Sequence, residues 1–211
     1  MARATKTKTR YSPHPSLAHA QAIVANMEAK TGRSLDAWVR LVRAGGPPAD
    51  AARAEWLRAE HGLGSNYAAW IVERAAGRGA EDTDPDAYLR AAASWVEAMF
   101  AGPKVVLRPI YDALLDAAFA LGRDVRVCPC RTIVPVFRTH VIAQVKIATR
   151  SRVDFGLALG KHRGKLPPRL VDTGGAAKKD RITHKLEVTE PGQVDAELRR
   201  WLQIAYDLDP A

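Results

Sequence analysis

The sequence lacks the features that would place it in several specialised classes of protein. Cysteine occurs only at Cys128 and Cys130, which excludes a disulfide scaffold and fits a reducing compartment. No apolar run approaches the roughly 18 residues of a membrane-spanning helix. The basic start of the chain is followed by Tyr11-Ser12-Pro13 instead of the apolar core of a signal peptide. We therefore expect a cytoplasmic protein without a membrane partner.

Patterns that would mark a catalytic, metal or cofactor site are also missing. The six histidines form neither an H-x-x-x-H nor an H-E-x-x-H pattern, and no Gly-x-Ser-x-Gly turn presents a nucleophile. Cys128-Pro129-Cys130 is not accompanied by the second cysteine pair that a zinc site needs. We therefore expect no catalytic residues, no metal and no cofactor. We favour a binding protein over an enzyme, and an enzyme ranks behind the two kinds of binding protein described below.

Positive charge is what the sequence has in excess. The 211 residues include 32 Lys and Arg against 23 Asp and Glu, a net charge of +9. Residues 123–185 hold 15 of the basic residues and only four aspartates, whereas residues 81–102 are acidic. The positive excess therefore lies mainly in one part of the fold, where it points to an anionic partner.

The first half of the chain has the apolar spacing of helices. One helix is predicted over residues 16–31 with Ser16 as its N-cap, and a second begins at a Ser34 N-cap. Two more carry Trp56 and Tyr67, and Pro85 opens a fifth. We divide this half into a disordered basic tail, a helical module, and an acidic linker with one helix: residues 1–12, 13–78 and 79–102.

The second half changes to the pattern of strands. After a helix that starts or kinks at Pro109, β-favouring residues alternate with a period of two, which predicts an antiparallel sheet with one buried face. The residues predicted on that face are Val125, Val127, Ile133, Pro135, Phe137, Val145, Val153, Ile182 and Leu186. A last helix with Leu198 and Trp201 should cover it. Residues 103–211 then form an α+β domain, and the fold class is α+β: an N-terminal all-helical module followed by an antiparallel sheet packed against helices.

Several motifs resemble a known family. In the first half these are His14-Pro15-Ser16, the Thr31-Gly32-Arg33-Ser34-Leu35 stretch that continues to Trp38, and Glu60-His61-Gly62-Leu63-Gly64. In the second half they include Leu107-Arg108-Pro109-Ile110-Tyr111. Together they resemble an uncharacterised bacterial two-module family, in which a helical domain of unknown function is joined to an α/β domain of unknown function. The resemblance assigns no activity and no site residue.

The favoured site is the outward face of the predicted sheet with its long loop. Strand side chains alternate, so cations flanking the buried residues point outward together. Such a face can neutralise phosphates with little reading of sequence. We predict a non-enzymatic binding protein whose partner is anionic, with nucleic acid favoured, and whose binding residues are Arg126, Lys146, Arg152, Lys178, Lys179 and Lys185.

The alternative is a small-molecule binding or sequestering protein. Four of the five tryptophans lie in the helical first half, where their side chains are available to line an apolar pocket. In this alternative the pocket lies between the two modules and is lined by Trp38, Trp56, Trp70, Trp95 and Phe100.

Two questions stay open. The turn Gly62-Leu63-Gly64 is either a helix cap or a phosphate-binding hairpin of the kind found in helix-hairpin-helix modules. The oligomeric state cannot be read from the sequence.

Overall fold

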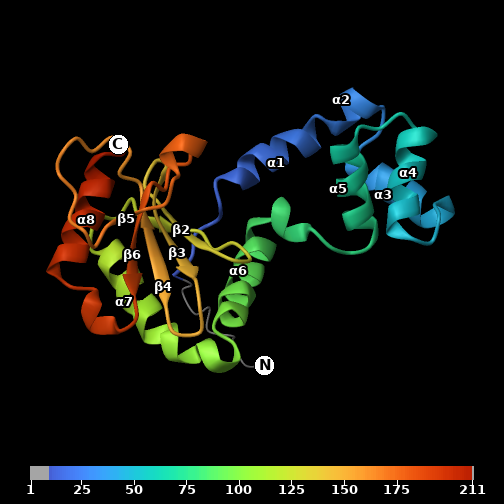
Figure 1. Ribbon diagram of the computed structural model, residues 1–211. Helices are drawn as coiled ribbons and strands as arrows, with labels where there is room; N and C mark the ends of the chain where they lie inside the picture. The colour runs from blue at the N-terminus through green and yellow to red at the C-terminus, as the bar shows by residue number, and fades with distance from the viewer. Residues whose placement is uncertain (1–9, 211) are drawn as a thin grey trace. The chain divides into compact units, whose positions relative to one another are not determined.

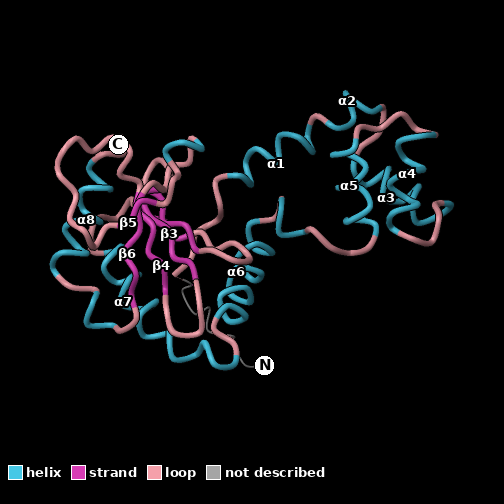
Figure 2. Tube along the Cα trace, in the orientation of Figure 1, coloured by secondary structure: helices cyan, strands magenta, loops and turns pink. Residues whose placement is uncertain are grey.

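The computed structural model describes residues 10–210, which form two compact units (Figure 1). One unit is Pro13–Arg90, and the other comprises the residues from Ala91 onward together with residues 10–12. Figure 2 shows that the first unit is helical and that all strands belong to the second. Most of the predicted basic tail, residues 1–9, lies outside the described residues. The two-part α+β prediction is confirmed.

The helical unit contains five α-helices, one 3-10 helix and the start of another α-helix. They are α1 (Ser16–Ala25), α2 (Met27–Thr31), α3 (Leu35–Gly45), α4 (Asp50–Ala59), α5 (Ser65–Ala75), η1 (Ala80–Asp82) and α6 (Pro85–Met99), which continues into the second unit. The core is built from residues of α2 to α5 and one loop residue: Met27, Trp38, Val42, Leu57, Leu63, Ala68, Ile71 and Val72.

The single helix predicted over residues 16–31 is wrong, because α1 and α2 are separated at Asn26. The Asn26 side-chain amide donates to the Ala22 carbonyl at 2.9 Å, and such local bonds compete with a regular helix. Ser16 is also not a cap: it is the first residue of α1, and its backbone N–H donates to the His14 ring at 3.1 Å. The helix end at Gly32 is confirmed, where φ is +77°.

The Ser34 cap is confirmed and gives a test of the helical unit. The Ser34 hydroxyl oxygen accepts a hydrogen bond from the Ala37 backbone N–H at 3.3 Å. Ser34→Ala should therefore lower the free energy of unfolding by about 1 kcal/mol. Ser65→Ala is the matched control, because Gly64 is the N-cap of α5 and Ser65 makes no cap bond. Its effect should stay within about 0.5 kcal/mol in urea unfolding; equal losses in both variants would contradict the cap assignment.

The second unit is an antiparallel sheet with helices on one face. Its elements are η2 (Gly102–Leu107), α7 (Arg108–Phe119), β1 (Arg126–Val127), β2 (Val134–Phe137), β3 (Val141–Ile147), β4 (Val153–Leu157), β5 (Val171–Asp172), η3 (Ala176–Lys178), β6 (His184–Val188), η4 (Pro191–Gln193) and α8 (Ala196–Asp207). The strand order is β1-β2-β3-β4-β6-β5. The buried face packs against α7 and α8, which lie beside the sheet in Figure 1. The last helix thus covers the predicted face.

The strand register confirms most of the predicted buried face and corrects part of it. Ala143 and Val145 pair with Leu157 and Phe155, and all four are buried. On β2, however, Val134 and Val136 join the core instead of Ile133, Pro135 and Phe137. All four residues of this strand are buried, so alternation in polarity could not identify its inner side, and the register shifts between Val136 and Phe137.

Ile182 was also placed on the wrong face. It precedes β6 and lies on the open face of the sheet, over Gly156 of β4. The short strand β5 was missed because its two residues are exposed and sit inside a loop rich in glycine and lysine. In the part of the chain that the structure describes, no helix has the length and apolarity to span a membrane.

Candidate functional site

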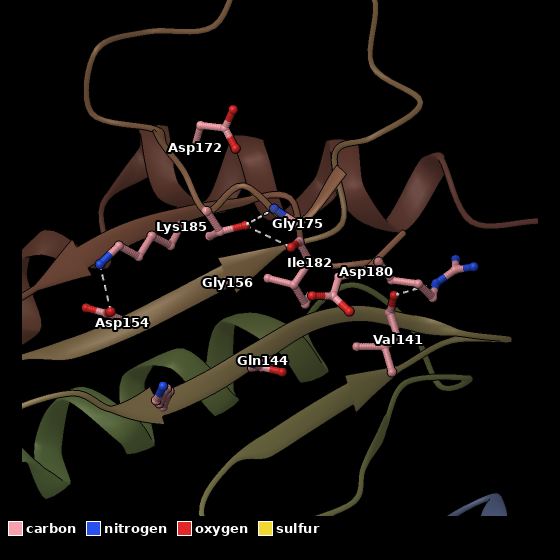
Figure 3. Close-up of a pocket in the computed structure, with 12 residues that line it drawn as sticks. Val141, Gln144, Asp154, Gly156, Asp172, Gly175, Asp180, Ile182 and Lys185 are labelled. Atoms are coloured by element: carbon pink, nitrogen blue, oxygen red, sulfur yellow. Dashed lines mark hydrogen bonds and ion pairs between the residues drawn. The ribbon is translucent and has the colours of Figure 1, made fainter. Parts of the chain in front are cut away.

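The open face of the sheet carries a pocket of about 690 Å³ (Figure 3). Strands β3, β4 and β6 form its floor, and the segment from Asp172 to Ile182 forms one wall. Its lining holds three cations and three carboxylates, together with an amide and small or apolar residues: Lys146, Arg181, Lys185, Asp154, Asp172, Asp180, Gln144, Val141, Gly156, Thr173, Gly175 and Ile182. The pocket is therefore mixed in charge, unlike the purely cationic face expected from the sequence.

Two glycines allow the wall to lie against the sheet. A Cβ on Gly156 would approach the Ile182 Cγ2 to 2.6 Å, and a Cβ on Gly175 would approach the Ile182 carbonyl oxygen to 2.2 Å. The Thr173 hydroxyl donates to that same carbonyl at 3.0 Å and accepts from the Gly175 N–H at 3.2 Å. The wall is thus a packed structure that needs glycine at both positions.

Two of the predicted binding cations are neutralised on the open face. The Lys185 ammonium lies 2.8 Å from Asp154 and 2.9 Å from Glu187. The Arg152 guanidinium contacts the same two carboxylates at 3.0 and 3.1 Å. The hydrogen bonds to Asp154 and then to Glu187 raise the pKa of Lys185, so it stays charged and paired. These four side chains form the central ion-pair network.

Four exposed lysines around the pocket have no ion pair among the described residues. Lys146 lines the pocket itself, and Lys161 lines a small neighbouring hollow that shares Asp180 and Arg181. Lys178 and Lys179 lie on the wall, between Gly175 and Asp180. We call these four residues the unpaired lysines. They are the cations most available to an anion.

Lys179 also has an unusual backbone conformation. Its φ is +59°, and it is the only described residue other than glycine with a positive φ. This left-handed conformation is sterically unfavourable for lysine, which has a Cβ atom, and glycine adopts it more readily. Its position on the pocket wall agrees with the tendency of such conformations to occur at functional sites.

A second ionic cluster, which sequence reasoning missed, fixes the far end of the wall. Asp209 is buried, and its carboxylate accepts from the His140 N–H at 2.8 Å, from the His140 ring at 2.9 Å and from Arg181 at 2.8 Å. Arg181 also donates to the Val141 carbonyl at 3.2 Å. Arg181 therefore ties the wall both to β3 and to the chain beyond α8.

The remaining predicted binding residue, Arg126, does not join this site. It lies on β1, at the opposite end of the strand order from β5, and donates to the Arg138 carbonyl at 2.9 Å. The structure therefore groups Lys146, Arg152 and Lys185 on the open face, with Lys178 and Lys179 on the adjoining wall. Arg126 stands apart from this group.

The tryptophans of the alternative site make contacts within their own units. In the helical unit, Trp38 is buried and donates to the Thr31 hydroxyl at 2.8 Å, and Trp56 donates to Glu60 at 2.9 Å. Trp70 is half-buried on α5. In the second unit, Phe100 packs on the Tyr111 ring at 5.1 Å, and Trp95 lies beneath the Arg131 guanidinium. The pocket between the modules stays a prediction.

The turn after α4 has the hydrogen bonds of a helix C-cap. Gly62 has a φ of +66°, its N–H donates to the Arg58 carbonyl at 3.1 Å, and the Leu63 N–H donates to the Leu57 carbonyl at 3.2 Å. Leu57 and Leu63 both belong to the core, as this kind of cap favours. Gly64, rather than Ser65, is the N-cap of the following helix. Every part of this turn is thus accounted for by helix capping.

Metal ligands do not come together in the described residues: no group of three His, Cys, Asp or Glu side chains there is placed to hold an ion. The side chains of the open face offer ionic contacts and hydrogen bonds.

Comparison with known proteins places the two units in two families. Residues 19–77 match a family described as a domain of unknown function (DUF4287), and residues 96–209 match another domain of unknown function (DUF5655). The second match covers more than half of the chain. The chain belongs to the DUF5655 family. The resemblance to a two-module uncharacterised family is thereby confirmed, and the pocket lies wholly in the DUF5655 domain. No curated protein and no solved structure matches the chain.

Proposed function

We propose that the DUF5655 domain binds an anionic partner, with nucleic acid favoured, through the open face of its sheet and the adjoining wall. The observation that carries this proposal is the set of unpaired lysines, Lys146, Lys161, Lys178 and Lys179, around the pocket on the open face of the sheet. Exposed cations that are not already neutralised can release phosphate counterions, and this release drives binding to nucleic acid. Arg152 and Lys185 contribute less, because Asp154 and Glu187 compensate them.

The location proposed with this function is the cytoplasm. Both cysteines, Cys128 and Cys130, are free thiols, which supports a reducing compartment. Burial raises the pKa of the Cys128 thiol to about 12, so this side chain is a packing residue rather than a reactive thiolate.

The test is a fluorescence-anisotropy titration of labelled single-stranded DNA, duplex DNA and RNA across roughly 50 to 200 mM salt. The test variant replaces Lys146, Lys178 and Lys179 by Gln. The matched control replaces Lys30, Arg40 and Arg123 by Gln; these cations are exposed, have no ion pair among the described residues and do not line the pocket.

We expect the parent chain to bind at low salt with a steep salt dependence. The test variant should bind at least tenfold more weakly than the parent, and for single strands its log–log salt slope should fall by about 2, because three phosphate contacts are lost. The control should keep most of the affinity. Equal weakening in both variants, or no binding by the parent chain at 50 mM salt, would overturn the proposal.

A further inference from the structure

The groups inside the pocket differ in chemistry from the lysines around it. Three aspartates, Asp154, Asp172 and Asp180, line the pocket together with three cations, so the formal charges of the lining are balanced. The carboxylates would repel the row of phosphate groups of a nucleic-acid strand, but they would not repel a polar, uncharged group with N–H donors. At about 690 Å³ the pocket falls within the usual size range of small-ligand sites, which is roughly 300–1,000 Å³.

Apart from the unpaired Lys146, two polar side chains in the pocket have no hydrogen-bond or ion-pair partner among the described residues. They are the carboxylate of Asp180, on the wall, and the side-chain amide of Gln144, on β3. Figure 3 shows both over the strands of the pocket floor, with Ile182 beside Asp180. Asp154 is already held by Lys185, and Asp172 accepts from the Gly174 N–H at 2.7 Å. Asp180 and Gln144 are therefore the groups left to recognise a ligand.

Their chemistry fits one edge of a nucleobase. A carboxylate only accepts hydrogen bonds, through two oxygens, whereas an amide can also donate. Guanine offers two adjacent N–H donors beside a carbonyl oxygen, so the carboxylate can accept both and the amide can donate to the oxygen. Val141 and Ile182 supply apolar contacts for the flat faces of the base. Lys146 follows Gln144 by two residues on the same face of β3, where it can meet a phosphate.

We infer that the pocket binds a single guanine nucleotide, with the base edge on Asp180 and Gln144 and the phosphate on Lys146. This inference deepens the proposed function, on which it rests for the phosphate contact. The same chemistry can come from a free nucleotide or from one unpaired nucleotide of a strand, and the two sources are separated by experiment.

The experiment compares guanosine and inosine monophosphates by calorimetric titration of the full chain. The two differ only in the amino group that Asp180 would accept. We expect guanosine monophosphate to bind at least tenfold more tightly, since a site built for a hydrogen bond discriminates strongly against a ligand that lacks it. Asp180→Asn should reduce this ratio to about twofold or less. Asp172→Asn, which keeps a side-chain oxygen for Gly174, is the matched control and should leave the ratio unchanged.

A second arm uses thymidine 12-mers with one central guanosine or inosine. A preference seen only in the 12-mers identifies a strand nucleotide as the ligand, and one seen in the mononucleotides identifies a free nucleotide; either supports the inference. Binding of 12-mers with no guanine preference in either arm overturns the inference and leaves the proposed function standing. Preferential binding of the mononucleotide without any oligonucleotide binding supports the inference and overturns the proposed function. Absence of any guanine preference in both arms overturns the inference.

Discussion

Asp209→Asn should lower the free energy of unfolding by about 2–3 kcal/mol, the largest stability effect expected at any polar residue discussed above. The Asp209 side chain is only 1% exposed and accepts hydrogen bonds from the His140 N–H, the His140 ring and Arg181. Hydrogen bonds to a charged group contribute about 1.5–3 kcal/mol each. The asparagine amide removes the charge and turns an N–H₂ group toward these donors. Partial exposure of His140 and Arg181 keeps the loss below the sum of the bonds.

The measurement is urea unfolding, with hydrogen exchange of the His140 amide as a local readout. Asp207→Asn is the matched control, because Asp207 is exposed at the end of α8 and, among the described residues, accepts a hydrogen bond only from Gln203. Its effect should stay within about 0.5 kcal/mol. Faster exchange at His140 should accompany the loss in Asp209→Asn. If both variants unfold alike, the Asp209 cluster does not stabilise the fold.

The same pair of variants should show a defined pH dependence. Burial raises the pKa of Asp209, but the His140 hydrogen bonds and the His140 and Arg181 charges outweigh it, so the net pKa lies below the ordinary 3.8. The stabilisation is therefore complete above pH 3.8 and is lost as the pH falls through the lower, folded value. The difference between parent and Asp209→Asn should stay constant from about pH 5 to 4 and shrink below. A difference that already declines between pH 7 and 5 would contradict this assignment.

Local chemistry explains which parts of the fold could be predicted. The Ser34 cap and the Gly32 helix end depend on residues within one turn, and both are confirmed. The break at Asn26 was missed because an asparagine within a helical pattern is compatible with a continuous helix until its side chain bonds the backbone. The inner side of β2 was missed because every residue of that strand is buried, so no polar alternation marked it.

The candidate site was predictable only in part. The outward direction of Lys146 and Lys185 follows from strand alternation, and the structure places both in the pocket. Their neutralising partners could have been predicted in the same way. Asp154 follows Arg152 by two residues and Glu187 follows Lys185 by two residues, so each acid points to the same side of the sheet as its base. If the acidic residues of that face are considered together with the basic ones, the sequence predicts the central ion-pair network.

The wall and its anchor could not have been found in this way. Ile182 crosses to the open face only because Gly156 leaves space beneath it, 26 residues earlier in the chain. Asp209 meets His140 across 69 residues and Arg181 across 28. No local pattern encodes these contacts, because they arise from the way the loop and the chain end fold back on the sheet.

The central ion-pair network gives the largest expected change in binding. Asp154→Asn combined with Glu187→Gln removes both carboxylates that compensate Arg152 and Lys185. Under the proposed function, two further cations then become available to phosphates, and the repulsion by two carboxylates disappears. Affinity for single-stranded DNA should rise on the order of 50-fold at 50 mM salt, and the salt slope should steepen by about 1.4, since each phosphate contact contributes about 0.7.

A matched control separates this effect from the change in net charge. Asp116→Asn combined with Glu97→Gln makes the same chemical change at exposed residues of the same unit, where the carboxylates pair with Arg10 and Arg108. These two carboxylates lie on α7 and α6 and do not line the pocket, so affinity should rise only a few-fold and the salt slope should hardly change. Anisotropy titrations of both double variants and the parent supply the comparison. Equal gains would show that net charge alone governs binding, and no gain in the Asp154 and Glu187 variant would mean that phosphates do not reach Arg152 and Lys185.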